Sequence, residues 1–367
     1  MTVKEIAILG AGHGGLAAAA DLGIRGFGVR LHARRQETLD PIIRQGGIQV
    51  SGVQEGLVPV SSTSTDLAEV IDGADLIMLV VPSVAHEYYA RLLAPILSRD
   101  VPIFLNPGHT CGGLHFVHCL RQAGYTSPVK TCEAVTLTYI CRKNGPASVE
   151  VFSYVKNLKF AGFPGKHATE LYDLLQPLFP EVELRSSVLE TGMTNINAVF
   201  HSPGMLMNAG WIEATDGNFL FYREGITQAV GKIIEDVDRE RLEITRALKI
   251  PSASFLENFY QAGLTTRQAM VSGDISRACY ESEPNKSIVS PPSLNHRYIH
   301  EDVGYGLVPF AAFGDLAGVQ TPTIDSIIHL CSRMMGVDYN RNGLTIEKMG
   351  LAQIPASDLD KFVHEGD

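Results

Sequence analysis

The sequence predicts an α/β protein in which an N-terminal Rossmann-type, doubly wound parallel sheet precedes a mostly α-helical C-terminal domain. In the first half, short continuous apolar runs alternate with helical patterns, which is typical of a parallel sheet covered on both faces. A glycine-rich turn follows the first of these runs directly. From about residue 187 helical patterns replace the strands, and 367 residues suffice for two domains. We therefore expect domains at 1–186 and 187–367.

The first half gives strand and helix signals in alternation. KEIAILGAG is an apolar strand that runs into glycines, LAAAADLGIRG is a helix, and GVRLHA is a second strand. Further strands are expected at 75–82 and 101–108, after helices at 65–74 and 86–97 respectively. Three later apolar segments, at 129–137, 147–155 and 157–164, are expected to extend the same sheet, and 166–180 to form its closing helix.

The second half is predicted to be helical. Long helical patterns lie at 194–214, 224–249 and 321–336. The apolar run GLVPFAAFGDLAG suits either the core of this domain or the interface of a homodimer, so a homodimer is one of two open alternatives.

Composition limits the partners. A formal net charge of −10 argues against a nucleic acid partner, which would need a concentrated basic face. No uninterrupted apolar run is long enough to span a membrane, and the start lacks the features of a secretion signal, so we expect a cytoplasmic protein. The six cysteines show no CxxC or Cys/His ligand spacing, so no metal site is predicted. The expected partners are small molecules.

A glycine fingerprint opens the chain. In GAGHGG, Gly10, Gly12 and Gly15 follow a predicted strand and open a helix, with His13 and Gly14 between them. Gly10 would allow the tight turn, Gly12 the approach of a pyrophosphate, and Gly15 the packing of helix on strand. This context favours a dinucleotide site over a structural glycine turn.

The end of the second strand indicates which dinucleotide binds. NAD-preferring sites place Asp or Glu there, about twenty residues past the glycines, whereas this chain has Ala33, Arg34 and Arg35. Two guanidinium groups could pair with a 2′-phosphate. NADP(H) is therefore the preferred cofactor and NAD(H) stays possible. The alternative is that the arginines only begin a solvated helix turn.

Two further loops are expected to wall the cofactor crevice. Val81 and Pro82 lie at the carboxyl end of DLIMLVVP, and Asn106 lies near the carboxyl end of VPIFLNPG. In this fold, loops at the carboxyl ends of the strands pass over the cofactor.

Catalytic candidates lie in the second half. His201 occurs in TNINAVFHSPG, and a histidine on an apolar helix is more often a core group than a catalyst. Glu301 and Asp302 offer carboxylates that could orient an imidazole, and Arg297 offers a fork suited to a carboxylate substrate. Spacing alone does not bring residues 201 and 302 together.

The order of several motifs resembles that of the opine dehydrogenases, over essentially the whole chain. These motifs are GAGHGG, TCEAVTLTYICR, TNINAVFHSPG, FYREGIT and NHRYIHEDVGYGLVP. The resemblance implies condensation of an amino acid or amine with a 2-oxo acid, and reduction of the imine by NAD(P)H to a secondary amine dicarboxylate. The norvaline-type members carry an acid at the end of the second strand, where this chain has Ala33-Arg34-Arg35, which puts NAD use in doubt.

The resemblance also implies residue roles. His201 and Asp302 match the family's acid–base pair, and Arg297 matches the arginine expected to hold a substrate carboxylate. Asn197, on the same segment as His201, is a further candidate for substrate binding. Tyr222 could line the amino-acid side of the site or belong to a helix start. Thr138 could contact substrate or lie at a buried strand end.

Two other functions compete with this interpretation. Ketopantoate-reductase-like or glycerol-3-phosphate-dehydrogenase-like enzymes share the domain plan and reduce a 2-oxo acid or ketone, but they usually use a lysine of the helical domain. Lys232 and its neighbours lack the surrounding motif. A non-catalytic NADPH-binding sensor would have no need for His201, Arg297 and Asp302 together.

Overall fold

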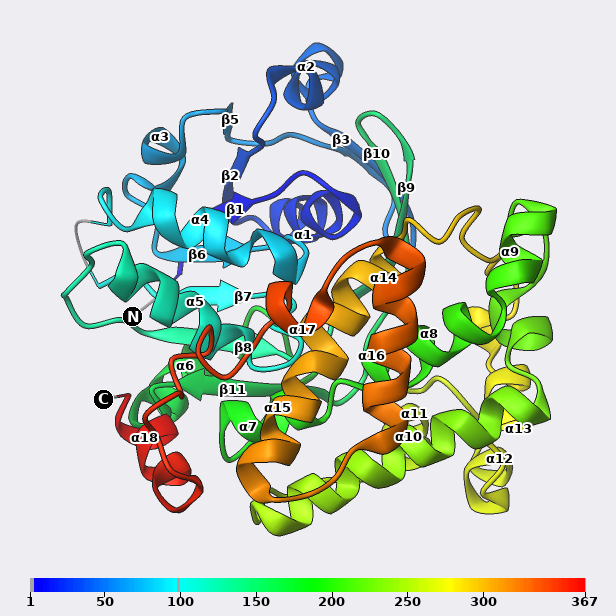
Figure 1. The fold of residues 1–367 in the computed structure, drawn as a ribbon. Helices are drawn as coiled ribbons and strands as arrows, with labels where there is room; N and C mark the ends of the chain where they lie inside the picture. The colour runs from blue at the N-terminus through cyan, green and yellow to red at the C-terminus, as the bar shows by residue number, and fades with distance from the viewer. Residues whose placement is uncertain (1–2, 98–99, 367) are drawn as a thin grey trace. The chain divides into compact units, whose positions relative to one another are not determined.

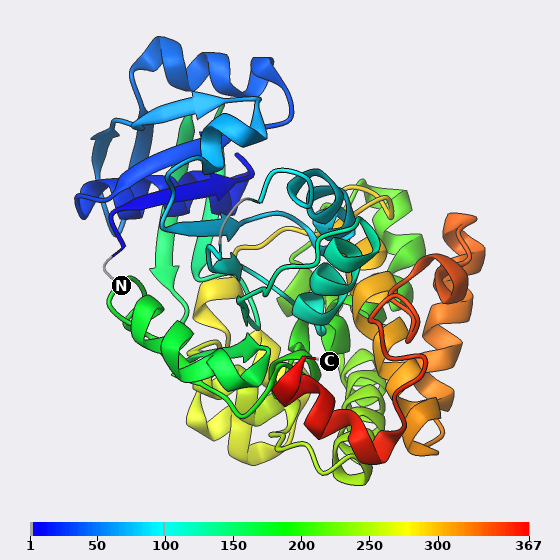
Figure 2. The ribbon, with the colours of Figure 1, turned by 90° about the vertical axis from the view of Figure 1, so that its left-hand side faces the viewer.

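The computed structural model describes residues 3–97 and 100–366, which divide into two compact units. The first unit holds the described residues up to Thr191 together with those from Asp360 onward, and the second is Gly192–Leu359. This division differs from the expected one at the C-terminus, because α18 (Leu359–Glu365) packs mainly on the first unit. Phe362 lies 6.2 Å from Phe163, centroid to centroid, and Figures 1 and 2 both show α18 in red beside α6.

Eight strands form the main sheet of the first unit, in the order β12-β11-β8-β7-β6-β1-β2-β5. The bounds are β1 Glu5–Leu9, β2 Gly28–His32, β5 Ser62–Ser64, β6 Leu76–Leu79, β7 Ile103–Leu105, β8 Thr131–Ala134, β11 Leu158–Phe163 and β12 Val182–Leu184. All neighbouring pairs are parallel except β8 with β11. The predicted doubly wound sheet is confirmed.

Helices lie between the strands of this unit in the chain, except the last, which follows β12. They are α1 His13–Ile24, α2 Gln36–Gln45, α3 Leu67–Ile71, α4 His86–Leu93, α5 Gly112–Gln122, α6 Ala168–Leu175 and α7 Val188–Met193. The sequence predicted α1, α3, α4 and α6, whereas α2 and α5 were not predicted; the glycine-rich start of α5 is typical of a loop.

One predicted strand was placed in the wrong sheet. Residues 147–155 were expected to extend the main sheet, but β10 (Ser148–Tyr154) belongs to a second sheet, β4-β3-β10-β9. Its partners are β3 Ile48–Gly52, β4 Gly56–Val58 and β9 Tyr139–Gly145. In β10 apolar and polar residues alternate, so Val149 and Val151 can be buried while the other face is not, and the sheet packs on α1.

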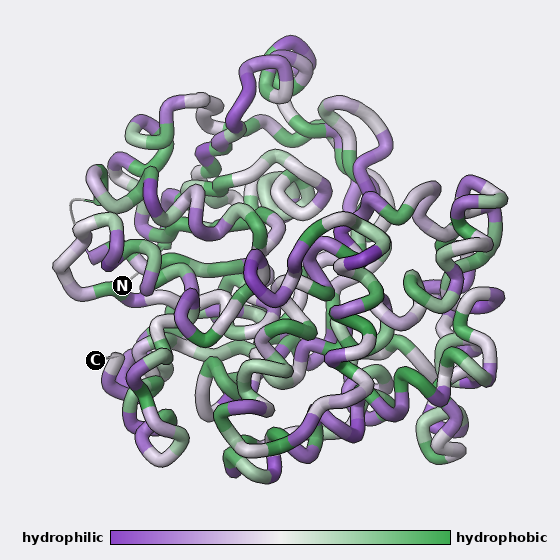
Figure 3. Tube along the Cα trace, in the orientation of Figure 1, coloured by the Kyte–Doolittle hydropathy of each residue, from purple (hydrophilic) through white to green (hydrophobic). Residues whose placement is uncertain are grey.

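The second unit is helical. Its elements near the site are α8 Ile196–Met207, α9 Ala209–Thr215, the π-helical turns η3 Phe221–Gly225 and η5 Val303–Leu307, α10 Gln228–Ala247, α14 Arg297–Asp302, α15 Val308–Ala317, α16 Pro322–Met335 and α17 Tyr339–Asn342. Helix α10 is amphipathic, and its hydropathy alternates along its length in Figure 3.

Two details of this unit bear on the predictions. The helical pattern at 194–214 is interrupted at Asn208, which divides it into α8 and α9. The apolar run GLVPFAAFGDLAG forms the end of η5 and α15, and Phe310 and Phe313 are fully buried within the unit, as core residues. Among the residues that the structure describes, no helix combines the length and the apolar character needed to cross a membrane.

Candidate active site

The imidazole of His201 is the centre of a buried hydrogen-bonded cluster in the helical unit. Its Nδ1 lies 2.9 Å from Oδ2 of Asp302, and its Nε2 lies 2.9 Å from the hydroxyl oxygen of Tyr222. The hydroxyl of Tyr222 lies 3.2 Å from that of Tyr298. The structure therefore brings together the two residues expected to form an acid–base pair, which are 101 positions apart.

Helix α14 supplies two of these groups because of its periodicity. Tyr298 and Asp302 are four positions apart, so they lie on the same face of the helix. Asp302 bonds the edge of the imidazole, while the ring of Tyr298 stacks on it at 3.7 Å with an interplanar angle of 13°. The sequence predicted no role for Tyr298, although its spacing of four residues from Asp302 was the available signal.

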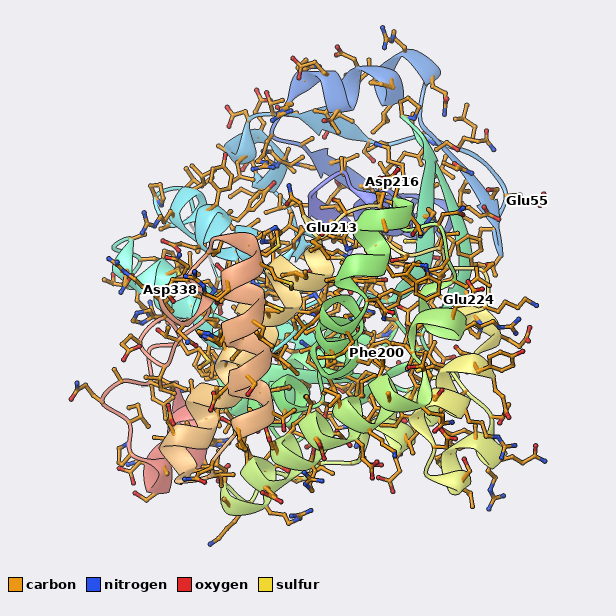
Figure 4. The ribbon with its side chains drawn as sticks, turned by 45° about the vertical axis from the view of Figure 1, so that its right-hand side comes forward. Glu55, Phe200, Glu213, Asp216, Glu224 and Asp338 are labelled. Carbon is orange, nitrogen blue, oxygen red and sulfur yellow. The ribbon has the colours of Figure 1, made fainter. Side chains whose placement is uncertain are left out.

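Aromatic rings enclose the same imidazole. Phe200 stacks on His201 at 4.3 Å, and Phe221 lies 6.2 Å away, centroid to centroid. Figure 4 shows Phe200 inside the helical unit, and it is 3% exposed. An apolar, water-poor surround strengthens the electrostatic interaction between His201 and Asp302.

Two glycines allow the surrounding segments to approach α8. A Cβ at Gly204 would lie 2.8 Å from Cζ of Phe221, and a Cβ at Gly306 would lie 2.4 Å from Cβ of Ala198. Larger residues at either position would push η3 or η5 away from α8. The HSPG and VGYG parts of the motifs thus serve close packing around His201.

Arg297 and Glu301, four positions apart on α14, form an ion pair. Nη1 of Arg297 lies 3.6 Å from Oε2 of Glu301, and the arginine side chain is 55% exposed while that of the glutamate is 3% exposed. The guanidinium lies 5.5 Å from the centroid of the Tyr298 ring. An exposed guanidinium next to the buried cluster is suited to bind a carboxylate.

The two histidines beside Arg297 have other contacts. His296 caps α14, since its Nδ1 accepts a hydrogen bond from the backbone N–H of Tyr298. Burial, together with the neighbouring charge of Arg297, lowers the pKa of His296 to about 4, which keeps Nδ1 able to accept. His300 bonds Asn295 and the hydroxyl of Tyr339.

Asn197 lies in the first turn of α8, four positions before His201 and so on the same face. Its backbone N–H donates to the side chain of Asn195, the N-cap of the helix. A contact of Asn197 with substrate stays a prediction.

The glycine turn of the first unit has the geometry that a dinucleotide site requires. Gly10 has φ +118°, and a Cβ there would lie 2.4 Å from the carbonyl oxygen of Val80. A Cβ at Gly15 would lie 1.8 Å from the carbonyl oxygen of Gly10, whereas nothing lies within 4 Å of a Cβ at Gly12. The turn is therefore closed on the side of the sheet and open at the N-terminus of α1, where a pyrophosphate would sit.

Other predicted cofactor residues surround this turn. A Cβ at Gly10 would lie 2.8 Å from Cγ1 of Val81, and a Cβ at Gly14 would lie 2.6 Å from Leu137. Pro82 is exposed just beyond Val81. His13 is exposed, and its Nδ1 accepts a hydrogen bond from the backbone N–H of Lys143.

The two arginines lie at the end of β2. Arg34 and Arg35 are both exposed, and Arg35 is the N-cap of α2. The guanidinium of Arg34 lies 5.8 Å from the centroid of the Tyr88 ring on α4.

Asn106 and Thr138 bond each other. The Asn106 side chain donates to the Thr138 hydroxyl at 2.6 Å and accepts from the Thr138 backbone N–H at 3.0 Å. Asn106 is 0% exposed and Thr138 3%. The pair joins the segment after β7 to the segment before β9, and contact of either residue with a ligand stays a prediction.

Comparisons with known proteins agree with this arrangement. Residues 184–335 match the family described as NAD/NADP octopine/nopaline dehydrogenase, alpha-helical domain. Residues 5–107 match the N-terminus of NAD-dependent glycerol-3-phosphate dehydrogenase. Over 365 residues the chain is 33% identical to an opine dehydrogenase of Arthrobacter sp. (strain 1C), which covers 98% of this chain and 99% of that one.

Solved structures show the same fold. Octopine dehydrogenase with NADH and L-arginine has a TM-score of 0.76 at 20% identity and covers 97% of both chains. Yersinopine dehydrogenase with NADP+ bound has a TM-score of 0.74 at 14% identity and covers 99% of this chain and 98% of its own.

Proposed function

The chain belongs to the opine dehydrogenase family and is an NAD(P)-dependent oxidoreductase, and on this premise we propose that it condenses an amino acid or amine with a 2-oxo acid and reduces the resulting imine. The observation that carries the proposal is the buried hydrogen bond between His201 and Asp302, with Arg297 on the same helix as Asp302. The product is an N-(carboxyalkyl) amino acid, and the same groups serve the reverse oxidation.

In this proposal His201 is the acid–base group and Asp302 its orienting partner. The carboxylate accepts from Nδ1–H of the imidazole, which leaves Nε2 to exchange a proton with the substrate nitrogen. Asp302 also stabilises the protonated imidazole once it forms. Arg297 holds a substrate carboxylate and so fixes the position of the imine. NAD(P)H, when bound, supplies the hydride.

The proposed cofactor is NADP(H) in preference to NAD(H). Support comes from Arg34 and Arg35, which are exposed at the end of β2, where the fold places the ribose of the adenosine half. Within the motif, Gly12 leaves the N-terminus of α1 open for the pyrophosphate. A homodimer and a cytoplasmic location stay predictions.

Simple reduction of a 2-oxo acid or ketone is the second candidate. It is favoured by the match of residues 5–107 to a glycerol-3-phosphate dehydrogenase N-terminus. In the helical unit Lys232 is exposed on α10. An exposed lysine lacks the burial that would tune it as a catalytic acid.

Oxidation of NADPH with pyruvate, measured with and without a panel of amino acids and amines, tests the proposal. We expect rapid oxidation only when both a 2-oxo acid and an amine are present, and a secondary amine dicarboxylate as the product by mass spectrometry. Full-rate oxidation with the 2-oxo acid alone would instead support the second candidate.

A further inference from the structure

The imidazole of His201 is covered at its Nε2 edge, which is the edge proposed to exchange a proton with the substrate. Nδ1 of His201 is engaged by Asp302, and Nε2 is engaged by the hydroxyl of Tyr222. His201 is 3% exposed, Tyr222 and Asp302 are each 4% exposed, and Tyr298 is 9% exposed. A substrate nitrogen can reach Nε2 only if Tyr222 moves aside or if Tyr222 itself carries the proton.

The hydrogen bonds fix the direction in which the protons point. Asp302 is an acceptor, so Nδ1 of a neutral His201 carries the hydrogen and Nε2 is the acceptor. Tyr222 then donates to Nε2, and its oxygen is left to accept from the hydroxyl of Tyr298 at 3.2 Å. Burial raises the pKa of Tyr222 well above its usual value, so this hydroxyl stays neutral and can donate and accept at once.

Tyr298 forms the outer end of this chain of hydroxyls. It is the most exposed of the four residues, and the guanidinium of Arg297 lies over its ring at 5.5 Å. A substrate whose carboxylate is bound by Arg297 would therefore be held next to Tyr298, with its nitrogen within reach of the Tyr298 hydroxyl in the proposed relay.

We propose that the hydroxyls of Tyr222 and Tyr298 relay the proton between Nε2 of His201 and the nitrogen of the substrate. This inference rests on the imine reduction proposed above and adds two residues to it. Protonated His201 gives its Nε2 proton to the oxygen of Tyr222, whose own hydroxyl proton passes to the oxygen of Tyr298. The hydroxyl proton of Tyr298 forms the new N–H bond. Both tyrosines end as neutral hydroxyls, and the imidazole loses the one proton that the nitrogen gains.

Tyr222→Phe and Tyr298→Phe test the relay, because each removes one hydroxyl and keeps the ring. Positioned proton transfer contributes roughly 10²–10⁴ in rate, so we expect kcat to fall at least about a hundredfold in each variant. The KM of both substrates should change by less than about threefold, since the carboxylate contact of Arg297 is retained. Tyr339→Phe is the matched control: it removes the 2.7 Å contact to His300, outside the relay, and should leave kcat unchanged.

A double variant separates a relay from a packing role. In a serial path, adding Tyr222→Phe to His201→Ala should lower the rate no further than His201→Ala does alone. The relay would be overturned if the rate loss of the double variant were the product of the losses of the two single variants. Wild-type kcat in Tyr222→Phe would overturn it as well. Thermal unfolding and NADPH binding, expected to match the wild type, show that each variant is folded; if Tyr222→Phe does not fold, Tyr298→Phe decides.

The outcome also separates the two proposals. If the wild-type enzyme oxidises NADPH with no pair of amine and 2-oxo acid, the proposed function fails. If the wild type turns over such a pair and the phenylalanine variants keep its kcat, only the relay fails.

Discussion

The two units of this enzyme hold their functional groups in different ways. In the first, the groups suited to bind a dinucleotide are mainly backbone, presented by one turn from Gly10 to Gly15. In the second, the proposed acid–base site is made of side chains from α8, η3 and α14, with His201 and Asp302 101 positions apart. The proposed pyrophosphate site is thus formed by neighbouring residues of one turn, while the proposed acid–base site depends on tertiary packing within the other unit. Losses in one unit should leave the property of the other intact.

His201→Ala should give the largest effect and the clearest separation. Removing the proposed acid–base group should lower kcat by about 10³-fold or more. NADPH binding, measured by fluorescence titration, should stay within about twofold because the glycine turn belongs to the other unit. His300→Ala, a change of the same type at the Asn295 and Tyr339 contacts, is the control and should retain most of kcat. A loss of NADPH affinity in His201→Ala would give that histidine a structural role.

Asp21→Asn should lower the stability of the first unit and leave the chemical step unchanged. Asp21 is 2% exposed on α1 and accepts from Tyr139 at 2.9 Å and Tyr154 at 3.0 Å, which attaches the second sheet to the helix. Exchanging one charged acceptor for an amide donor should lower the free energy of unfolding by roughly 3 kcal/mol in urea titrations. Asp216→Asn, at an exposed position with φ 50°, should leave it unchanged. Equal stability of the two variants would show that this buried carboxylate does not hold the second sheet.

Substitution of Arg34 and Arg35 tests whether the first unit recognises the 2′-phosphate of NADPH. Replacing both by Gln should weaken NADPH roughly tenfold to a hundredfold, because two charge-assisted contacts to a phosphate are lost. NADH should bind within about twofold of the wild type, since it lacks that phosphate. Arg44→Gln, exposed at the other end of α2, is the matched control. Equal losses for both cofactors would make the arginine pair a general surface feature.

The same contrast explains what the sequence could predict. The glycine turn and the parallel strands were recognisable because their signals lie within a few neighbouring residues, as at Gly10, Gly12 and Gly15. His201 and Asp302 were paired through the order of family motifs, not through spacing. The hydrogen bonds of Tyr222 and Tyr298 were not predicted, because they depend on how η3 and α14 pack on α8. The prediction of the sheet to which β10 belongs was wrong for the same reason. Strand β10 is recognisable in the sequence, but its neighbours in space are not.

The smallest expected effect concerns a buried carboxylate in the first unit, whose contribution to stability should change gradually with pH. Glu133 on β8 is 0% exposed, and it accepts hydrogen bonds at 2.7 Å from the hydroxyl of Thr191 and from the backbone N–H of Gly113. Burial raises the pKa of Glu133 to about 7, although those two hydrogen bonds and the nearby His109 oppose the shift.

The stability of the protein should therefore fall as pH rises from 5 to about 7. In that window folded Glu133 keeps its proton while the unfolded chain, with a pKa near 4.5, has released it, so the folded state binds more protons. The loss should be on the order of 2 kcal/mol between pH 5 and 8. Glu133→Gln keeps the shape without the titration, so the difference in unfolding free energy between wild type and variant should change by that amount across the window. Glu235→Gln, exposed on α10, should show no such change. Parallel pH curves for wild type and Glu133→Gln would mean that Glu133 is ionised throughout, held by Thr191 and the N-terminus of α5.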